Sequence, residues 1–251
     1  MNKKLVLFFI LSHVCIHSDV KPRAKVGLLV MATGKYTLFL PELFASADTY
    51  FLPNHDCTYF VFTDGQVPLS DHVIRIEQKR LGWPYDTMMR FKVYYDAREQ
   101  FKDFDYLFAC DADMLFVDTV GDEILGERVG TQHPGFSLPH QRKDDYERNG
   151  ASTACVHEAE GQYYFAGGFY GGSTQEFLRM AFICTQNIII DLNHNIIAQW
   201  HDESHLNRYF IDYPPTVILS PSYCYPDLWD LPFDKKLLAL TKNHNEFRSN
   251  P

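Results

Sequence analysis

Hydrophobic residues along the chain occur in two patterns, short continuous runs and helically spaced repeats. Residues 25–32 form an unbroken apolar stretch (KVGLLVMA), which predicts a strand buried on both faces of a sheet. Residues 36–51 place apolar side chains at helical spacing, and Pro41 predicts a late helix start or a kink. Residues 57–63 and 73–77 predict two further strands.

A second helix and a further strand are predicted after residue 77. Residues 88–101 predict a helix, and residues 105–110 (DYLFAC) predict a strand that ends on Asp111-Ala112-Asp113. This succession predicts an α/β fold with a mostly parallel central sheet flanked by helices. Ligands bind at the carboxyl ends of the strands in such sheets. We therefore expect Asp111 and Asp113 to lie at a functional site.

A glycine-rich segment, residues 166–172 (AGGFYGG), precedes the sequence Ser173-Thr174-Gln175-Glu176. Ser173 and Glu176 form a capping box, which predicts the start of an amphipathic helix that runs to about residue 190. The glycines indicate close backbone approach to a ligand, tight strand packing, or simply a turn. No repeat or linker interrupts the chain, so one folded unit is expected from about residue 21.

Composition and charge narrow the function. The 251 residues are 46% hydrophobic and 22% charged, which is typical of a folded globular protein. The net charge is −9 and no basic run stands out, so nucleic acid is not an expected partner. An acidic protein that binds an anionic substrate needs a metal ion or a local cluster of Lys and Arg. The six cysteines contain no C-x-x-C pair, which argues against a zinc ribbon or a thioredoxin.

The N-terminal residues 1–20 leave several alternatives open. Lys3 and Lys4 precede an apolar stretch over residues 5–16, which is shorter than the ~20 residues that span a bilayer. The length suits a signal peptide, a membrane anchor or a peripheral apolar helix. Peripheral or anchored membrane association is expected on this basis.

Two clusters carry candidate chemistry. Asp111 and Asp113 offer hard oxygen ligands for Mg²⁺ or Mn²⁺, although an isolated Asp-x-Asp is more often a solvated turn. The second cluster is Trp200-His201-Asp202-Glu203-Ser204-His205. His201 and His205 have the spacing of a zinc-protease motif with Asp in place of its Glu, so a zinc hydrolase is an alternative function.

Several motifs together resemble one known family, glycosyltransferase family 6, which contains the ABO histo-blood-group transferases and the α1,3-galactosyltransferases. The motifs are ATGKY, YFVFTDG, DYLFACDADMLF, HPGF, YER, YYFAGGFYGGS, WHDESHLN, PTVILSP and KNHNEFR. The resemblance runs from about Lys25 to the C-terminus. It implies a single GT-A domain with a Rossmann-like α/β fold: a nucleotide-sugar half (25–120), an acceptor half (121–240) and a C-terminal clamp (241–251). The short chain suggests a compact bacterial or viral member, for which the resemblance implies a location on the cytoplasmic face of a bacterial membrane; a eukaryotic member would lie in the Golgi lumen.

The resemblance also implies the activity and its partners. The family transfers galactose or N-acetylgalactosamine (GalNAc) from a UDP-sugar, with retention, in α1,3 linkage to a galactose-terminated glycan acceptor. Asp111 and Asp113 match its D-x-D motif, which holds Mn²⁺, or Mg²⁺, against the diphosphate. Trp83 and Arg90 match a loop that closes over the donor. The positions that match donor-binding residues are Tyr36, Trp83, Arg90, Asp111, Asp113, Ala166, Gly167, Gly168, Lys242 and Arg248.

The remaining matches concern catalysis and the acceptor. Glu203 matches the family's catalytic carboxylate, and Asp202 matches a residue that contacts the donor. Glu203 would form a covalent glycosyl intermediate or stabilise an oxocarbenium-like ion in a front-face transfer, and the sequence leaves both open. In isolation, the two acids would suit an N-cap and a solvated first-turn residue. His133 and Trp200 match acceptor-binding positions.

Departures from the family and small residues bear on specificity. Met31 and Thr33 stand where bulkier residues often pack on the uracil base. Ala166 and Gly168 are small at the positions that face the sugar's C2 substituent, which predicts a preference for UDP-GalNAc over UDP-galactose. A non-catalytic sugar-binding protein on the same fold is the main alternative function, although such a protein needs no diphosphate clamp such as Lys242.

Overall fold

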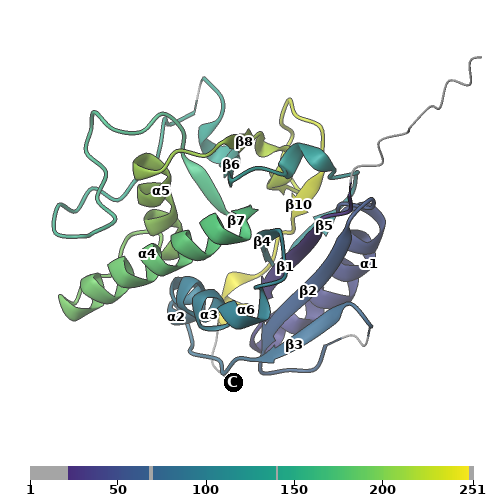
Figure 1. The fold of residues 1–251 in the computed structure, drawn as a ribbon. Helices are drawn as coiled ribbons and strands as arrows, with labels where there is room; N and C mark the ends of the chain where they lie inside the picture. Colours follow the sequence, from purple (N-terminus) through teal and green to yellow (C-terminus); the bar gives the residue numbers. More distant parts are fainter. Residues whose placement is uncertain (1–21, 68–69, 140, 249–251) are drawn as a thin grey trace, which may run out of the picture.

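A computed structural model describes residues 22–67, 70–139 and 141–248 of the chain (Figure 1). The N-terminal segment 1–20, with its predicted anchor or signal, lies outside the described residues. The strands are β1 Lys25–Met31, β2 Asp56–Thr63, β3 Val73–Glu77, β4 Tyr106–Asp111, β5 Met114–Phe116, β6 Arg128–Gln132, β7 Phe165–Ser173, β8 Val217–Leu219, β9 Tyr225–Pro226 and β10 Leu237–Ala239. The α-helices are α1 Leu40–Tyr50, α2 Tyr85–Met88, α3 Arg90–Asp96, α4 Thr174–Asn193, α5 Asp202–Asp212 and α6 His244–Arg248, and the 3₁₀ turns are η1 Gly34–Phe39, η2 Arg98–Gln100, η3 Asp122–Ile124, η4 Pro134–Phe136 and η5 Pro221–Tyr223.

The central sheet has seven strands in the order β3-β2-β1-β4-β7-β6-β8. Strands β3, β2, β1 and β4 are mutually parallel, and so are β6 and β8, whereas β7 runs antiparallel to both of its neighbours. A small second sheet has the order β5-β10-β9. The predicted α/β fold with a mostly parallel central sheet is confirmed.

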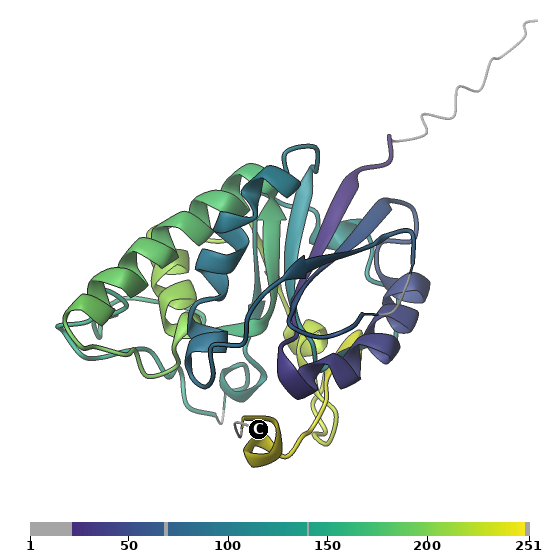
Figure 2. The same ribbon diagram turned by 90° about the horizontal axis from the view of Figure 1, so that it is seen from below.

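Strand β1 shows why the continuous apolar run is needed. Val26, Leu28 and Val30 point into a core cluster shared with α1, whereas Leu29 points into the opposite cluster with α3, α4 and α5. Figure 2 shows α1 on one side of the sheet and α3 and α4 on the other. Since successive side chains of a strand face opposite sides, a strand covered on both faces must be apolar throughout.

The helix predicted for residues 88–101 is broken into three pieces. Helix α2 begins earlier, at Tyr85, and the backbone leaves helical geometry at Met89 (ψ 7°) and at Ala97 (ψ 5°) before η2. The break makes Arg90 the first residue of α3, so its predicted loop position is wrong. The Arg90 side chain is buried in ion pairs with carboxylates of other elements, and these contacts favour the interrupted geometry over one continuous helix.

The glycine-rich segment forms strand β7 rather than a turn. A Cβ atom on Gly171 would lie 2.4 Å from the Leu107 carbonyl oxygen of β4, and one on Gly172 (φ +153°) would lie 2.1 Å from the Glu127 carbonyl oxygen. The glycines therefore permit tight strand packing, as one of the alternatives predicted. The predicted N-cap is confirmed, because Ser173 Oγ accepts from the Glu176 N–H, and α4 ends at Asn193, slightly beyond the predicted residue 190. The reciprocal bond of the capping box does not form: the Ser173 N–H donates to the Glu127 carbonyl oxygen, and the Glu176 carboxylate pairs with Arg128.

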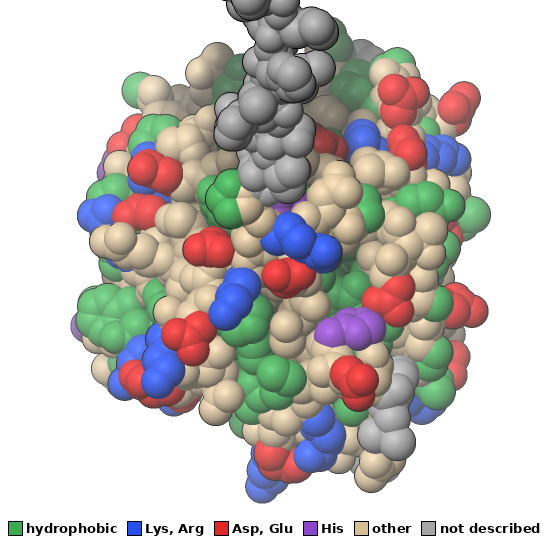
Figure 3. All heavy atoms as spheres, turned by 45° about the vertical axis from the view of Figure 1, so that its right-hand side comes forward, with side chains coloured by type: hydrophobic (Ala, Val, Ile, Leu, Met, Phe, Trp, Pro, Cys, Tyr) green, Lys and Arg blue, Asp and Glu red, His purple; other side chains and the backbone are tan. Residues whose placement is uncertain are grey.

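The surface charge is mixed on the face shown in Figure 3. Acidic and basic side chains of the described residues are interspersed there, without a broad basic area. Within residues 22–67, 70–139 and 141–248, no helix combines the length and the apolar character that crossing a membrane requires.

Candidate active site

The carboxyl ends of β1 and β4 open into a cavity of about 270 Å³. Asp111 is the last residue of β4, and Asp113 follows it, as expected for a ligand site in a parallel sheet. Most of the site residues predicted from the sequence line this cavity. They are Tyr36, Trp83, Arg90, Asp111, Asp113, Gly167, Gly168, Trp200, Asp202, Glu203 and Lys242.

Asp113 lies deeper than Asp111. The Asp113 side chain is 9% exposed, whereas the Asp111 side chain is 36% exposed. The pKa of the Asp113 carboxyl is raised above its ordinary value. Burial and the neighbouring Asp111 raise it, and the paired Lys242 ammonium offsets only part of that effect. This pair of carboxylates has the oxygen chemistry that Mg²⁺ or Mn²⁺ prefers.

Arg90 connects the carboxylate pair to helix α5. Its Nη1 atom lies 2.8 Å from Asp111 Oδ1, and its Nε atom lies 2.9 Å from Asp202 Oδ2. Nη1 also donates to the Gly167 carbonyl oxygen at 3.1 Å. Burial opposes the charge of Arg90, but the two carboxylates keep its pKa above the ordinary value. A buried cation thus fixes three elements of the site: β4, β7 and α5.

Glu203 is held by two donors. The Tyr164 hydroxyl donates to Oε1 at 2.8 Å, and the Gly167 N–H donates to Oε2 at 2.7 Å. Burial raises the pKa of Glu203 to about 7, although both hydrogen bonds favour its charged form. The carboxylate therefore has a fixed orientation beside the cavity, which suits a group that acts on one face of a substrate.

Asp202 does not cap helix α5. His201 occupies the N-cap position, with an unusual φ of +55° and no capping bond from its side chain, and Asp202 is the first helical residue. Asp202 is 2% exposed, and burial raises its pKa to about 7, while the ion pair with Arg90 lowers it. Glu203 is partly buried and hydrogen-bonded as well. The reading of this pair as a cap followed by a solvated acid is wrong for both residues.

The two residues predicted to bind the acceptor have different surroundings. Trp200 is 45% exposed at the cavity wall, and its indole N–H donates to Asp145 Oδ2 at 2.8 Å. His133 is not among the lining residues; its ring packs on Phe136 and Tyr164, and burial lowers its pKa to about 4. His133 therefore reaches the site only through Tyr164, the partner of Glu203.

The C-terminal segment covers one side of the cavity. The ring of Phe247 in α6 stacks on Phe39 with centroids 5.2 Å apart and meets Tyr36 edge-on at 5.3 Å. Arg80 Nη2 donates to the Phe247 carbonyl oxygen at 3.2 Å. Arg248 is the last residue of α6, and its side chain lies outside what the structure describes. In Figure 2 the C-terminal helix lies at the lower edge of the molecule.

Ala166 and Gly168 share one face of β7, but only Gly168 lines the cavity. Ala166 is 2% exposed in the core. A Cβ atom on Gly168 would lie 3.1 Å from Cys224 Sγ and 3.7 Å from Asp111 Oδ2. A methyl group would therefore fill space directly beside the Asp-x-Asp motif.

The two histidines of the zinc alternative have separate environments. His201 lines the cavity, and its ring lies 4.8 Å from that of Trp83. His205 is 1% exposed, its Nε2 atom lies 3.7 Å from Asp191 Oδ2, and burial lowers its pKa to about 4. The described residues contain no group of three or more His, Cys, Asp and Glu side chains arranged to hold a metal.

Sequence reasoning missed several contributors to the site, among them Tyr164, Arg80 and Phe247. Tyr164 lies within the YYFAGG motif, and its position before a glycine-rich strand at the site was a usable signal. Arg80 lies in an irregular segment, and Phe247 lies near a chain end, where no periodicity identifies a role. Both residues line the cavity, and Arg80 donates to the Phe247 carbonyl oxygen, which joins the tail to the irregular segment.

Comparison with known proteins identifies the family. The family model described as glycosyltransferase family 6 matches residues 16–249. The chain is 37% identical to the histo-blood group ABO system transferase 1 of Rattus norvegicus, over 89% of this chain and 68% of the relative. It is 34% identical to the human globoside alpha-1,3-N-acetylgalactosaminyltransferase 1 (86% and 65% covered). It is also 28% identical to the O-antigen biosynthesis glycosyltransferase WbnI of Escherichia coli (90% and 98% covered). The resemblance seen in the motifs is confirmed, and the α/β sheet with its Asp-x-Asp edge is a GT-A-like domain in a chain that belongs to glycosyltransferase family 6.

Proposed function

We propose that this glycosyltransferase moves GalNAc from UDP-GalNAc, with retention and in α1,3 linkage, to a galactose-terminated glycan acceptor. The observation that carries the proposal is the placement of Glu203. Two hydrogen bonds fix its carboxylate in the same cavity as the Asp111–Asp113 pair. A retaining transfer needs a carboxylate beside the anomeric carbon and a countercharge for the leaving diphosphate.

The charge of the cavity supports a metal ion. Its lining residues comprise the cations Arg80, Arg90 and Lys242 and the acids Asp86, Asp111, Asp113, Asp202 and Glu203. Five carboxylates against three cations would repel a UDP-sugar. A divalent cation held by Asp111 and Asp113 would offset that excess of negative charge. When bound, Mn²⁺ or Mg²⁺ would stabilise the charge of the departing UDP.

The other residues have positioning and binding roles in this proposal. The half formed by residues 25–120 binds the nucleotide, with Tyr36 and Trp83 as aromatic walls, and residues 121–240 bind the acceptor. Arg90 holds Asp111 and Asp202 in place. Residues 241–251 form the clamp, in which Lys242 and Arg248 bind the diphosphate.

Glu203 acts on the anomeric carbon of the donor. The bond between that carbon and the β-phosphate oxygen breaks, and UDP leaves with the electron pair. Glu203 attacks the anomeric carbon directly, or stabilises the positive charge there while the acceptor hydroxyl attacks from the face that UDP leaves. In the first route the acceptor oxygen then attacks the same carbon from the face that UDP has left, and the bond to Glu203 breaks. In both routes the acceptor proton passes to the phosphate of the departing UDP, and the new glycosidic bond has retained configuration.

One experiment tests the function as a whole. Purified protein is incubated with Mn²⁺, a β-galactoside and UDP-GalNAc or UDP-galactose, and the release of UDP and the linkage of the product are measured. The proposal requires an α1,3-linked product. Binding of the galactoside without UDP release would instead identify a sugar-binding protein, and hydrolysis that depends on zinc would identify a hydrolase.

Truncation after Leu240 tests the clamp. Loss of Lys242 and of the Phe247 contact removes a cation and a cover from the cavity, so we expect UDP to bind about 10-fold or more weakly and transfer to slow as well. Isothermal titration with UDP and Mn²⁺ and the steady-state rate measure the two effects. If affinity and rate both stay at the wild-type values, the tail has no role in donor binding.

Gly168→Ala tests the choice of donor. The added methyl group, beside Asp111 and Cys224, reduces the space for an acetamido group, so kcat/KM should shift toward UDP-galactose. Filling a pocket by one small group changes such ratios by roughly 10- to 200-fold. Competition between the two donors measures the ratio. A wild-type preference for UDP-galactose, or an unchanged ratio in the variant, would show that other residues shape the pocket.

A further inference from the structure

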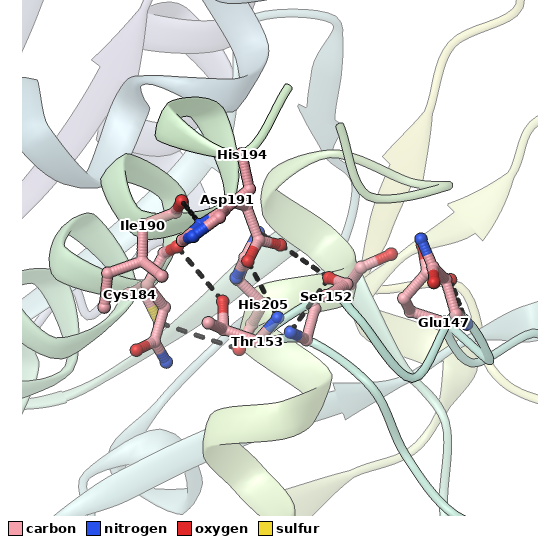
Figure 4. Close-up of polar contacts among 12 residues, drawn as sticks. Glu147, Ser152, Thr153, Cys184, Ile190, Asp191, His194 and His205 are labelled. Carbon is pink, nitrogen blue, oxygen red and sulfur yellow. Dashed lines mark hydrogen bonds and ion pairs between the residues drawn. The ribbon is translucent and has the colours of Figure 1, made fainter. Parts of the chain in front are cut away.

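A long irregular segment, residues 144–160, lies between η4 and β7 and packs beside α4 and α5 (Figure 4). Asp191, in the last turn of α4, anchors this segment and is 1% exposed. Its carboxylate accepts from Ser152 Oγ at 2.5 Å and from the Thr153 N–H at 2.8 Å. A buried carboxylate bound by two donors fixes the backbone that it contacts.

The same segment contacts the chain at two points near Trp200, the backbone N–H of Gln199 and the indole N–H of Trp200 itself. Glu147, which is 7% exposed, accepts from the Gln199 N–H through Oε2 at 2.7 Å and from the Asn149 N–H through Oε1 at 2.7 Å. Asp145, two residues earlier, accepts from the Trp200 indole N–H at 2.8 Å. One carboxylate therefore holds the backbone immediately before Trp200, and the other holds its side chain.

We propose that Asp145 and Glu147 are positioning residues that fix Trp200 in the wall of the cavity, with Asp191 anchoring the segment that carries them. The inference rests on the proposed function, in which Trp200 contacts the acceptor sugar. Neither carboxylate is among the cavity-lining residues. Trp200 does line the cavity, and its partly exposed ring has one polar atom, the indole N–H that donates to Asp145.

A double-mutant cycle tests the side-chain contact. Asp145→Ala should lower kcat/KM for the acceptor by about 10-fold, the scale of one charge-assisted hydrogen bond, and leave the Kd for UDP within about twofold. In a Trp200→Phe background, which lacks the indole N–H, the same change should have little further effect. Asp145→Asn keeps an oxygen acceptor and should recover most of the loss. An equal loss in both backgrounds would overturn the proposal, because Asp145 would then act without Trp200.

Glu147→Gln tests the backbone contact. The glutamine has one carbonyl oxygen for two N–H donors, so one donor loses its partner, and acceptor kcat/KM should again fall while the Kd for UDP is kept. Glu158→Gln, an exposed change in the same segment, is the matched control and should leave both values within about twofold. A Glu147→Gln enzyme with wild-type acceptor kinetics would contradict the proposal.

Fluorescence separates this inference from the proposed function. Asp145→Ala should shift the tryptophan emission of the intact protein, and the shift should be absent in the Trp200→Phe background. If the wild-type protein transfers no sugar but the shift appears, the proposed function fails and the positioning holds. If the wild-type protein transfers sugar and Asp145→Ala changes neither emission nor kinetics, the positioning fails.

Discussion

Asp113→Asn should reduce sugar transfer by roughly 100-fold or more. The substitution removes one of two carboxylates expected to hold the metal, and the departing UDP then loses part of its counterion. Removal of a single preorganised stabilising group typically costs about 10²–10³ in kcat. Initial rates with saturating UDP-GalNAc and Mn²⁺ measure the effect. Excess EDTA should produce the same loss in the wild-type enzyme, and added Mn²⁺ should reverse it.

Asp118→Asn is the matched control for this prediction. Asp118 is exposed, lies five residues along the chain, and accepts only from the neighbouring Thr119 N–H among the contacts described. Its variant should keep nearly full activity. Asp113→Asn also leaves Lys242 without its carboxylate partner, so the chelator experiment is the one that isolates the metal. Full activity in excess chelator would rule out the metal role of both aspartates.

The edge of the sheet was predictable because its signals are local. The apolar run over residues 25–32 can be satisfied only by burial on both faces, and the strand over 105–110 delivers Asp111 to the ligand-binding edge of a parallel sheet. The N-cap at Ser173 is likewise encoded locally, by a residue type that accepts from the first turn of a helix. The family resemblance then assigned roles that spacing alone left open.

The contacts around Glu203 and Arg90 were not predictable in this way. Tyr164 and Glu203 are 39 residues apart, and Arg90 reaches a carbonyl oxygen 77 residues along the chain. Such pairs depend on how β7 and α5 pack. The break in the predicted helix at Met89 lies next to Arg90, and no residue of the local sequence marks it.

The backbone conformation of His201 was also not predictable from the sequence. Its φ of +55° lies in the left-handed region, which non-glycine residues rarely adopt. Nothing in its residue type signals this conformation. The geometry makes His201 the N-cap and leaves Asp202 free to enter the helix and meet Arg90. Two acids that resemble an ordinary helix start in the sequence therefore meet Arg90, Tyr164 and Gly167 instead.

Glu203→Gln should lower kcat strongly and leave donor affinity nearly unchanged. Glutamine has almost the same shape, so it fills the same space but carries no charge. Only one of its two terminal atoms can accept the hydrogen bonds that Tyr164 and Gly167 donate to the carboxylate. The lost interaction is made mainly in the transition state, which affects kcat rather than ground-state binding. Steady-state kinetics and titration with UDP measure the two quantities, and Glu158→Gln again provides the control.

The size of this effect bears on the chemical role of Glu203. Loss of electrostatic stabilisation in a front-face transfer should cost about 10²–10³ in kcat. Loss of a nucleophile that forms a covalent intermediate should cost roughly 10⁴ or more, as for residues of catalytic triads. Mass spectrometry of the wild-type protein after a short reaction with donor would detect a glycosyl adduct on Glu203 in the second case only. If kcat is unchanged in the variant, Glu203 has a structural role, because its two hydrogen bonds would then serve only to join β7 to α5.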